Sequence, residues 1–325
     1  MPKRRKRIVF FMLLIIAALL GFYFTIDLFG QRSLDRLYSP RKWVNLEKGY
    51  KDDIQKRVLI PQSEGSKLRI AIVPIMSPEW SLSLYNKLIN YMGQELGMES
   101  VMLQRSSYSE IGDLLQYDNC EIGFTGAYPF VLGERDYGLK LLAVPRINGK
   151  ITYQSLIIVP AASDAQTLLD LKGKRFASCD IISLAGWVYP AVWLIQQGEN
   201  PRKFFGEHII SRSNDRAVNA VAAGFADGAA VSNIVYERMI NNDPGLADKI
   251  RIIMKSPEFA APPIVVNPRL DPAVRERVRH FLLSMHESSE GKKILADLGI
   301  DRYEFPESKL YDDVRKYASL WNPKP

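Results

Sequence analysis

The sequence predicts an α/β protein of two lobes, each with a parallel-type sheet and flanking helices, joined by a hinge and preceded by one transmembrane helix. Three observations support this prediction. Short apolar runs alternate with helical patterns, which is typical of parallel sheets covered by helices. The alternation starts again after Pro160, which indicates a second lobe. A long uncharged apolar run lies near the N-terminus.

The N-terminus combines a basic tail with an apolar run that is long enough to span a bilayer. The tail, residues 1–7, holds consecutive cations from Lys3 to Arg7, and the run from Ile8 to Ile26 has no charged residue. Because a bilayer core of ~30 Å needs about 20 helical residues, we expect residues 8–28 to form a transmembrane helix. The cations predict a cytoplasmic N-terminus, which places the main domain on the periplasmic side of a bacterial inner membrane.

A cleaved secretory signal is the competing interpretation of this run. Such signals have shorter apolar regions, of about 7–15 residues, followed by small residues at the cleavage site. The run continues instead through GFYFTIDLFG (21–30), which has no A-x-A-like site and no cysteine for lipid attachment. We therefore expect an uncleaved anchor, followed by a polar juxtamembrane stalk over residues 29–66.

The charge balance gives no argument for a nucleic-acid partner. The chain has a net charge of +7, and most of that excess comes from the N-terminal tail. No later stretch interleaves Lys and Arg with aromatic residues, so we expect no nucleic acid among the partners. The tail itself suits the anionic head groups of the membrane.

Neither the cysteines nor the histidines form a metal-binding pattern. Cys120 and Cys179 could pair in an oxidising compartment, whereas their apolar neighbours favour buried free thiols, and the sequence leaves both states open. His208, His280 and His286 are scattered, and the last two are not three or four residues apart, the spacing that shares a helix face. We therefore expect no metal and no cofactor.

The first lobe is predicted from two segments, residues 67–153 and 257–325. We expect strands at 68–74, 100–104, 121–125, 139–145 and 262–267, and helices at 82–96, 109–115, 272–288, 291–298 and 310–320. Gly97 suits the C-terminus of the first of these helices.

The second lobe is predicted over residues 154–256. A strand at 153–160 leads into it, strands follow at 175–179, 209–210, 228–232 and 250–254, and helices lie at 168–173, 183–197, 215–223 and 234–240. The chain would cross between the lobes near Tyr153 and again between Ser256 and Pro263.

The candidate ligand-binding residues follow predicted strands or begin predicted helices, because ligands of open α/β sheets bind beyond the carboxyl ends of the strands. Ser183 begins a helix, so its hydroxyl and the free amides could hold an anion; the alternative is that it only caps its own helix. Tyr and Trp suit a cleft because each carries a polar atom on an apolar body. The candidates are Ser77, Thr125, Tyr128, Tyr153, Ser183, Gly186, Trp187, Ser232 and Asn233.

No catalytic motif accompanies these residues. The patterns G-x-S-x-G, H-E-x-x-H and G-x-x-x-x-G-K are absent, and no histidine follows a predicted strand, where it could activate a nucleophile. Asp180 could act as a base, although a carboxylate at a helix start is more often structural. We therefore expect a binding protein and not an enzyme.

Several segments, taken in order, carry a resemblance to a known family. They are LRIAIVP (68–74), CEIGFTG (120–126), ITYQSLII (151–158), LLDLKGK (168–174), SND (213–215) with ADGAA (226–230), and LGIDR (298–302). This ordered set resembles the phosphate/phosphite/phosphonate-binding proteins of ABC transporters, which are type II-like periplasmic binding proteins. The resemblance implies two α/β lobes joined by crossing strands, with a ligand cleft between them, here in a membrane-anchored variant.

The chain departs from that family at the ligand site. It has SLAG (183–186) where members with a phosphonate-type site carry Ser-Thr-Ser-Gly, and Ser232-Asn233 where they tend to carry Asp-Ser. Phe130 stands where an aromatic hydroxyl is expected, although Tyr128 is close by, and Tyr153 matches the pattern. Because each lost donor is worth about 1 kcal/mol or more to a buried anion, we expect an altered ligand site.

Two functional hypotheses follow. The first is a membrane-anchored extracytoplasmic solute-binding protein. It would take a small molecule, with an oxyanion as one option, and would deliver it to an ABC permease or report it to a sensor kinase. The second is a binding-protein fold that serves as a ligand-free structural or regulatory subunit of a membrane complex. In this second case, the loss of a ligand would explain why the helix start lacks the hydroxyl residues that the family carries there.

Overall fold

The structure is a computed structural model that describes residues 67–73 and 75–321. The predicted basic tail (1–7), transmembrane helix (8–28) and stalk (29–66) lie outside the described residues. Within the described ranges, no helix is both long and apolar enough to cross a bilayer.

The first lobe is built on a six-stranded sheet in the order β13-β4-β12-β3-β1-β2. Its strands β1 and β2 pair in parallel, as do β1 and β3, whereas β12 is antiparallel to β3 and β4, and β13 is antiparallel to β4. The bounds are β1 Lys67–Ile72, β2 Glu99–Gln104, β3 Ile122–Phe124, β4 Lys140–Arg146, β12 Ile264–Val266 and β13 Arg302–Glu304.

The second lobe is built on a five-stranded sheet in the order β10-β6-β9-β7-β8. Strand β7 is parallel to β8 and β9, whereas β6 is antiparallel to β9 and β10. The bounds are β6 Ser155–Pro160, β7 Arg175–Ser178, β8 Glu207–Ile210, β9 Gly228–Ser232 and β10 Ile250–Lys255.

Both sheets are therefore mixed, and the expectation of parallel-type sheets is wrong in this respect. The reason is the double crossing of the chain. Strands β6 and β12 each enter a lobe from the interlobe side, so they run against the neighbouring strands that end there. An antiparallel strand of this kind carries the same apolar residues as a parallel one when both faces of the sheet are covered, so composition does not reveal its direction.

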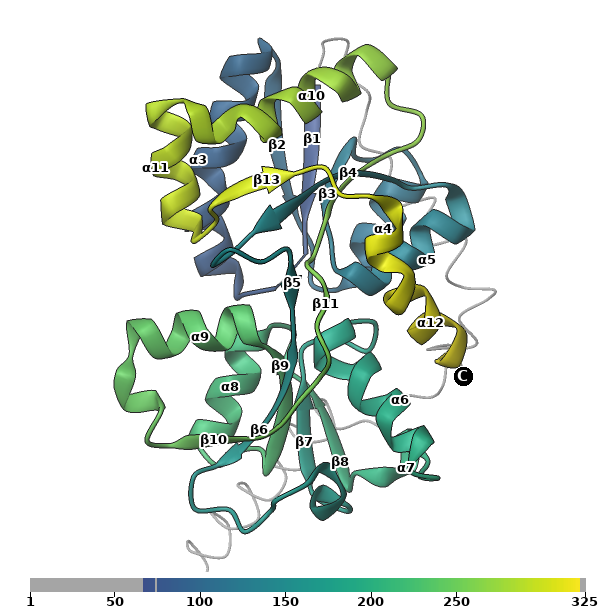
Figure 1. Cartoon of the computed structure of the whole chain (residues 1–325), viewed down its shortest axis with the longest axis vertical. Coiled ribbons are helices and arrows are strands. Elements are labelled where there is room, and N and C mark those ends of the chain that lie inside the picture. The colour runs from purple at the N-terminus through teal and green to yellow at the C-terminus, as the bar shows by residue number, and fades with distance from the viewer. Residues whose placement is uncertain (1–66, 74, 322–325) are drawn as a thin grey trace, which may run out of the picture. The chain divides into compact units, whose positions relative to one another are not determined.

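Two short strands connect the lobes side by side (Figure 1). Strand β5 (Thr152–Tyr153) carries the chain out of the first lobe and pairs antiparallel with β11 (Phe259–Ala260), which carries it back. Below this pair, the Ser155 amide donates to Ser256 Oγ at 2.8 Å. Two adjacent extended segments of this kind form the hinge.

Helices cover both sheets, and each lobe has its own apolar core. Gly97, in the left-handed conformation at φ 61°, ends α3 as expected. The helices of the first lobe are α3 Pro78–Leu96, α4 Tyr108–Gln116, α5 Ala127–Tyr137, α10 Pro272–Ser284, η4 Met285–Glu287, α11 Ser289–Leu298, η5 Ser308–Tyr311 and α12 Asp312–Leu320. Those of the second lobe are η1 Leu168–Leu171, η2 Leu184–Val188, α6 Tyr189–Gln196, α7 Pro201–Phe204, α8 Asn214–Ala222, α9 Asn233–Asn242 and η3 Pro244–Leu246.

Helical segments α5 and η2 differ from the sequence-based expectation. Helix α5 was not expected, because its first five residues, Ala127 to Val131, are all buried and so show no apolar stripe of helical period. The helix expected over 183–197 begins with a π-helical turn, η2, in which the amide of Val188 donates to the carbonyl of Ser183 at 3.0 Å. Pro190 follows and has no amide proton to continue the ordinary pattern.

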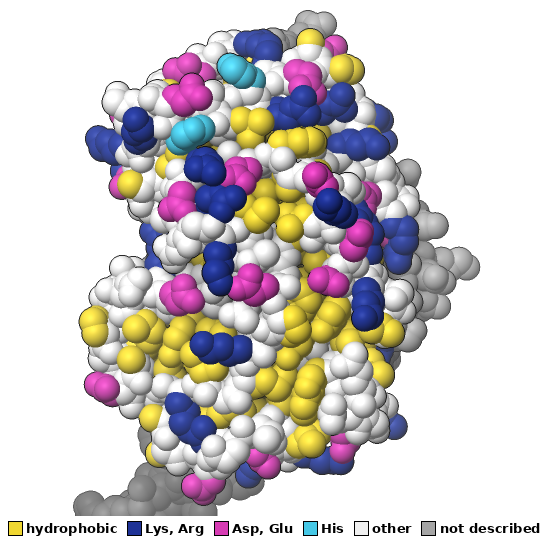
Figure 2. Space-filling model, viewed as in Figure 1, with side chains coloured by type: hydrophobic (Ala, Val, Ile, Leu, Met, Phe, Trp, Pro, Cys, Tyr) yellow, Lys and Arg dark blue, Asp and Glu magenta, His cyan; other side chains and the backbone are white. Residues whose placement is uncertain are grey.

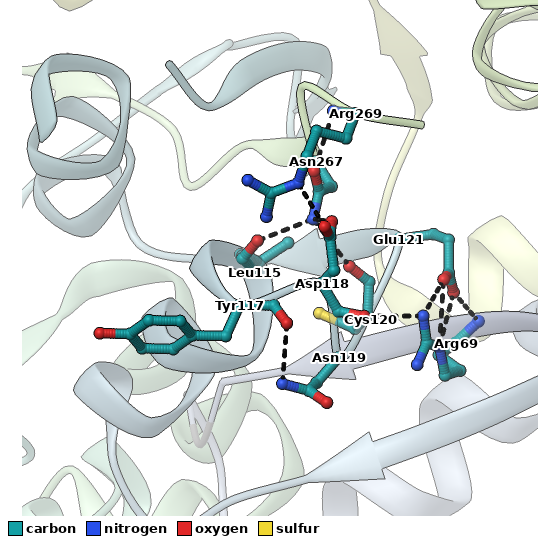
Figure 3. A network of polar contacts seen from close by, with 9 residues as sticks. All are labelled: Arg69, Leu115, Tyr117, Asp118, Asn119, Cys120, Glu121, Asn267 and Arg269. Carbon is teal, nitrogen blue, oxygen red and sulfur yellow. Dashed lines mark hydrogen bonds and ion pairs between the residues drawn. The ribbon is translucent and has the colours of Figure 1, made fainter. Parts of the chain in front are cut away.

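A polar network ties the two segments of the first lobe together at the start of β3 (Figure 3). Asn267, which follows β12 and is buried, donates from Nδ2 to the Leu115 carbonyl at 2.7 Å and to Asp118 Oδ1 at 2.6 Å. Asp118 also pairs with Arg269. Because α4 and β12 come from distant parts of the sequence, these bonds fix the returning chain against the first segment.

The face of the molecule in Figure 2 carries cations interspersed with anions, and not a stripe of one sign. Hydrophobic side chains are more extensive over the second lobe on this face. Several cations form ion pairs, among them Arg146 with Glu304 at 2.6 Å and Arg315 with Glu134 at 2.8 Å. Mixed charge of this kind does not concentrate positive potential on this face.

Candidate functional site

The candidate site lies between the lobes, where the loops after β1, β2 and β3 meet those after β7, β8 and β9. The amide of Ser77 donates to Asp215 Oδ1 at 2.9 Å. Asn214 donates from its amide and from Nδ2 to the Ile75 carbonyl, at 3.1 and 3.0 Å. Ser77 and Ile75 precede α3 in the first lobe, and Asn214 and Asp215 begin α8 in the second, so the lobes are joined directly by hydrogen bonds.

A second direct connection is made by the carboxylate of Asp180. Asp180 Oδ2 accepts from the amide of Tyr108 at 3.1 Å, and Oδ1 accepts from the amide of Ile182 at 3.0 Å. Burial raises the pKa of Asp180, and these two amides act in the opposite direction. Since Tyr108 is the first residue of α4, the carboxylate of one lobe occupies the position at a helix N-terminus of the other where an anion would bind.

The predicted residues Ser183 and Gly186 follow Asp180 closely in the chain, and the phenol of Tyr153 lies near Cys179 and the backbone of Ala185. Ser183 Oγ accepts from the amide of Gly186 at 3.1 Å, so the hydroxyl caps its own helical turn. A Cβ atom on Gly186 would lie 2.8 Å from Cys179 Sγ, which leaves no space there for a larger residue. Burial raises the pKa of the Cys179 thiol to about 12 and raises that of the Tyr153 phenol.

Both cysteines are buried and free in the described part of the chain. Burial also raises the pKa of the Cys120 thiol. Because the thiolate is the reactive form, neither cysteine has the character of a nucleophile. Cys120 and Cys179 lie in different lobes, next to β3 and β7 respectively, and each acts as a small apolar side chain in its core.

Two other predicted residues, Thr125 and Ser232, line a cavity of about 80 Å³ between the lobes. Thr125 follows β3 and is 3% exposed, and Ser232 ends β9 and is 5% exposed. The amide of Thr125 donates to the Pro263 carbonyl at 3.1 Å, and the amide of Ser232 donates to Asn214 Oδ1 at 3.0 Å. Their backbones are therefore fixed at the wall of the cavity.

The remaining predicted residues do not line this cavity. The Tyr128 hydroxyl donates to the Trp321 carbonyl at 2.9 Å, inside the first lobe. Trp187 stacks on His208 with ring centroids 3.8 Å apart. Asn233 Oδ1 accepts from the amide of Gln154 at 2.8 Å and so supports the hinge. Ser77 contributes its amide, as described above.

Several residues at the interface were not among the sequence-based candidates: Tyr108, Asp180, Asn214, Asp215 and Arg238. Asp180 was considered only as a base, although its place after a predicted strand was a usable signal. Asn214 and Asp215 lie in the SND segment, which was noted for its resemblance alone. Tyr108 donates its backbone amide to Asp180, which no side-chain pattern reveals, and its phenol hydrogen-bonds to Ser183.

Comparisons with known proteins agree on one family. The family described as "ABC transporter, phosphonate, periplasmic substrate-binding protein" matches residues 70–311. The phosphate-import protein PhnD of Mycolicibacterium smegmatis is 23% identical over 224 residues, which cover 65% of this chain and 70% of that protein. A probable ABC transporter phosphite-binding protein, PhnD1 of Prochlorococcus marinus, is also 23% identical, over 59% of this chain and 65% of its own length.

Solved structures show the same fold. A binding-protein component of an ABC phosphonate transporter from Pseudomonas aeruginosa has a TM-score of 0.73 and 21% identity, covering 78% of this chain and 86% of its own. Prochlorococcus marinus PhnD1 in complex with methylphosphonate has a TM-score of 0.70 and 19% identity, and the match covers 78% of this chain and 97% of that chain. Together with the two-lobed α/β architecture and the family match over residues 70–311, these findings show that the chain belongs to the phosphonate-binding family of periplasmic ABC-transporter substrate-binding proteins.

Proposed function

We propose that this protein is an extracytoplasmic solute-binding protein, anchored to the membrane by residues 8–28, whose ligand site no longer accepts a phosphonate or phosphate. A tether of this kind keeps the binding domain near a membrane partner, an ABC permease or a sensor kinase, and so raises its effective concentration there. The observation that carries the proposal is the carboxylate of Asp180 at the N-terminus of α4.

The position of Asp180 is unfavourable for an oxyanion in two ways. Its oxygens already accept from the amides of Tyr108 and Ile182, so these donors are not available to a ligand. Its negative charge would also repel an incoming anion. At a separation of about 4 Å and an effective dielectric constant near 20, two unit charges interact by about 4 kcal/mol, which corresponds to roughly a thousandfold in Kd.

The residues around Asp180 offer little compensation. The hydroxyl of Ser183 is engaged with the amide of Gly186. Leu184 and Ala185, which follow it, are buried and have no polar side-chain atom. The phenols of Tyr108 and Tyr153 lie here too, but they already interact with Ser183 and with the backbone of Ala185. An anion at this helix start would therefore meet an apolar turn and a buried carboxylate.

Titration calorimetry on the full chain in detergent tests this proposal. Methylphosphonate, phosphite and phosphate should each bind more weakly than about 1 mM, or not at all. The Asp180→Asn variant should bind methylphosphonate more tightly than the parent, because the repelling charge is gone. Asp248→Asn, at an exposed carboxylate of the second lobe, removes the same charge elsewhere and should behave as the parent. Micromolar binding of any of the three anions to the parent protein would refute the proposal.

A second function is favoured by the direct hydrogen bonds between the lobes. Asp215 and Asn214 join the second lobe to the loop before α3. Arg238 of α9 donates to the carbonyls of Leu298 and Asp297, at 2.9 and 2.8 Å. Lobes held together in this way need no ligand to close, as a ligand-free structural or regulatory subunit would require. Recovery of stable partner subunits from solubilised membranes, unaffected by any solute, would support this second function.

A further inference from the structure

The cavity between the lobes has a mostly apolar wall and the size of a small solute. It measures about 80 Å³. A single water occupies roughly 10–15 Å³ by this measure, so the space suits a solute of about five to eight non-hydrogen atoms. Phe124 and Ile264 line it from the sheet of the first lobe, and Val235 lines it from α9 of the second. Asp180 and Ser183 do not line it, so this cavity is separate from the helix start that the Asp180 carboxylate occupies.

Arg238 of α9 brings a positive charge to this cavity. Its Nη1 and Nη2 donate to the carbonyls of Leu298 and Asp297, at 2.9 and 2.8 Å. A guanidinium has five N–H donors, so these two bonds leave others for a further acceptor. The Asp297 carboxylate is within electrostatic range of Arg238 but pairs with Lys87 at 2.6 Å. Among the described residues, no acidic side chain lines the cavity, so the charge of Arg238 has no anionic partner there.

Two tyrosines of the first lobe, Tyr85 of α3 and Tyr303 of β13, also line the cavity. Burial raises the pKa of Tyr85, and the positive charge of Arg238 acts in the opposite direction. Burial also raises the pKa of Tyr303, and the neighbouring Tyr85 phenol raises it further. Such mutual effects require that the three groups lie close together. Both phenols keep their protons at neutral pH, so each can donate a hydrogen bond to an anion.

We propose that this cavity binds a short aliphatic carboxylate, whose carboxylate group pairs with Arg238 and accepts hydrogen bonds from Tyr85 and Tyr303. A planar carboxylate matches the geometry of a guanidinium, and its single negative charge balances the single positive charge of Arg238. A phosphonate or phosphate dianion would leave a second charge without a partner in an apolar space. This inference rests on the proposed function, since it names the class of solute that takes the place of a phosphonate.

A carboxylate in this position would contact both lobes. Arg238 belongs to α9 of the second lobe, whereas Tyr85 and Tyr303 belong to the first. The aliphatic part of the solute would lie against Phe124 and Val235, which also come from different lobes. Such a ligand therefore favours the closed arrangement of the lobes.

A matched pair of probes tests the class of solute on the parent protein. Isobutyrate and isobutyramide have nearly the same shape, but only the first is charged at pH 7. Each is titrated by calorimetry into the full chain in detergent, with an empty-micelle blank. Isobutyrate should bind saturably with a Kd of about 1 mM or tighter. Isobutyramide should bind at least about tenfold more weakly, because hydrogen bonds from a charged donor are stronger when the acceptor is also charged.

Substitution of Arg238 tests the origin of the preference between the two probes. Arg238→Gln should abolish the preference for isobutyrate, whereas a purely structural loss of the bonds between the lobes would weaken the binding of both probes alike. Arg251→Gln is the matched control and should keep the preference. The guanidinium of Arg251 also donates to two backbone carbonyls, those of Ser163 and Ala165, but Arg251 does not line the cavity.

Substitution of the two tyrosines tests the phenols as donors. The double variant Tyr85→Phe, Tyr303→Phe preserves the rings while removing both hydroxyls, and should weaken isobutyrate binding by about tenfold or more. Tyr91→Phe removes a hydroxyl of α3 that lies 3.1 Å from Ser288 Oγ, outside the cavity, and should bind isobutyrate as the parent does. Thermal unfolding verifies that each variant is folded.

The outcomes separate this inference from the proposed function. Absence of saturable isobutyrate binding up to about 10 mM, equal or tighter binding of isobutyramide, or an unchanged preference in Arg238→Gln would each overturn the inference. None of these results would restore phosphonate binding, so the proposed loss of phosphonate and phosphate binding would stand. Micromolar methylphosphonate binding in the same protein would instead overturn the proposed function.

Discussion

Acidification from pH 7 to pH 4 is expected to lower the free energy of unfolding by about 3 kcal/mol through His208 alone. Burial lowers the pKa of this imidazole from 6.5 to about 4. The ring stacks on Trp187, and its Nε2 lies 2.7 Å from Ser178 Oγ, so the folded protein holds it in the neutral form.

The sign follows from which state binds the proton first. In the unfolded chain, the histidine takes up its proton as the pH falls through 6.5, whereas in the folded protein it does so only near pH 4. Between these values the unfolded state binds more protons and is favoured. The stabilisation is therefore fully present above pH 6.5 and is lost as the pH approaches 4.

Urea unfolding of the full chain in detergent at several pH values measures this effect. Other groups also titrate in this range. We therefore compare the change in the free energy of unfolding between pH 7 and pH 4 in the parent with the same change in His208→Gln. Glutamine keeps a hydrogen-bonding side chain near Ser178. On acidification, the free energy of unfolding of the variant should fall by about 3 kcal/mol less than that of the parent. His280→Gln, at an exposed position of α10, is the control. Identical profiles for the parent and His208→Gln would contradict the prediction.

Replacing Glu121 by alanine is expected to lower the free energy of unfolding by about 3 kcal/mol. Glu121 accepts from the Arg69 amide at 2.6 Å and from Arg69 Nε at 3.0 Å, and both side chains are only 17% exposed (Figure 3). Its removal leaves a largely buried guanidinium without its main partner and a backbone amide without an acceptor. Consistent with this pairing, the hydrogen bond to Glu121 raises the pKa of Arg69.

An exposed ion pair supplies the comparison for Glu121. Glu258 pairs with Lys150 at 2.5 Å, but these side chains are 43% and 64% exposed. Solvent screening makes such a pair worth less than about 1 kcal/mol, so Glu258→Ala should change stability far less than Glu121→Ala. Urea unfolding at pH 7 measures both variants. Equal losses of unfolding free energy in the two variants would show that burial of the Arg69–Glu121 pair does not determine its contribution to stability.

Much of the fold could be predicted from local patterns. The strands that became β1, β2, β3, β7 and β9 were expected within one or two residues of their bounds, because each is a short apolar run between turn residues. Strand direction could not be predicted, since β6 and β12 owe their direction to the crossing of the chain and not to their own residues. Helix α5 was missed because its first residues are buried on every side, so the sequence shows no apolar stripe of helical period there.

The candidate site was harder to predict, for a physical reason. Thr125 and Ser232 were expected from their place after strands, and they share one cavity. The direct bonds between the lobes, however, use backbone amides of Ser77 and Tyr108 as donors. Such donors are common to nearly every residue, so only the three-dimensional arrangement shows that Asp180 and Asp215 meet them.

The distance between the lobes is the measurement that tests the central claim most directly, namely that this protein closes through its own carboxylates and without a phosphonate. Spin labels at Gln94→Cys on α3 and Asp248→Cys before β10 occupy exposed positions on different lobes, and the native thiols are buried. Double electron–electron resonance on the full chain should give one narrow distance that about 1 mM methylphosphonate does not change. A long or broad distribution that shortens when methylphosphonate is added would contradict the account.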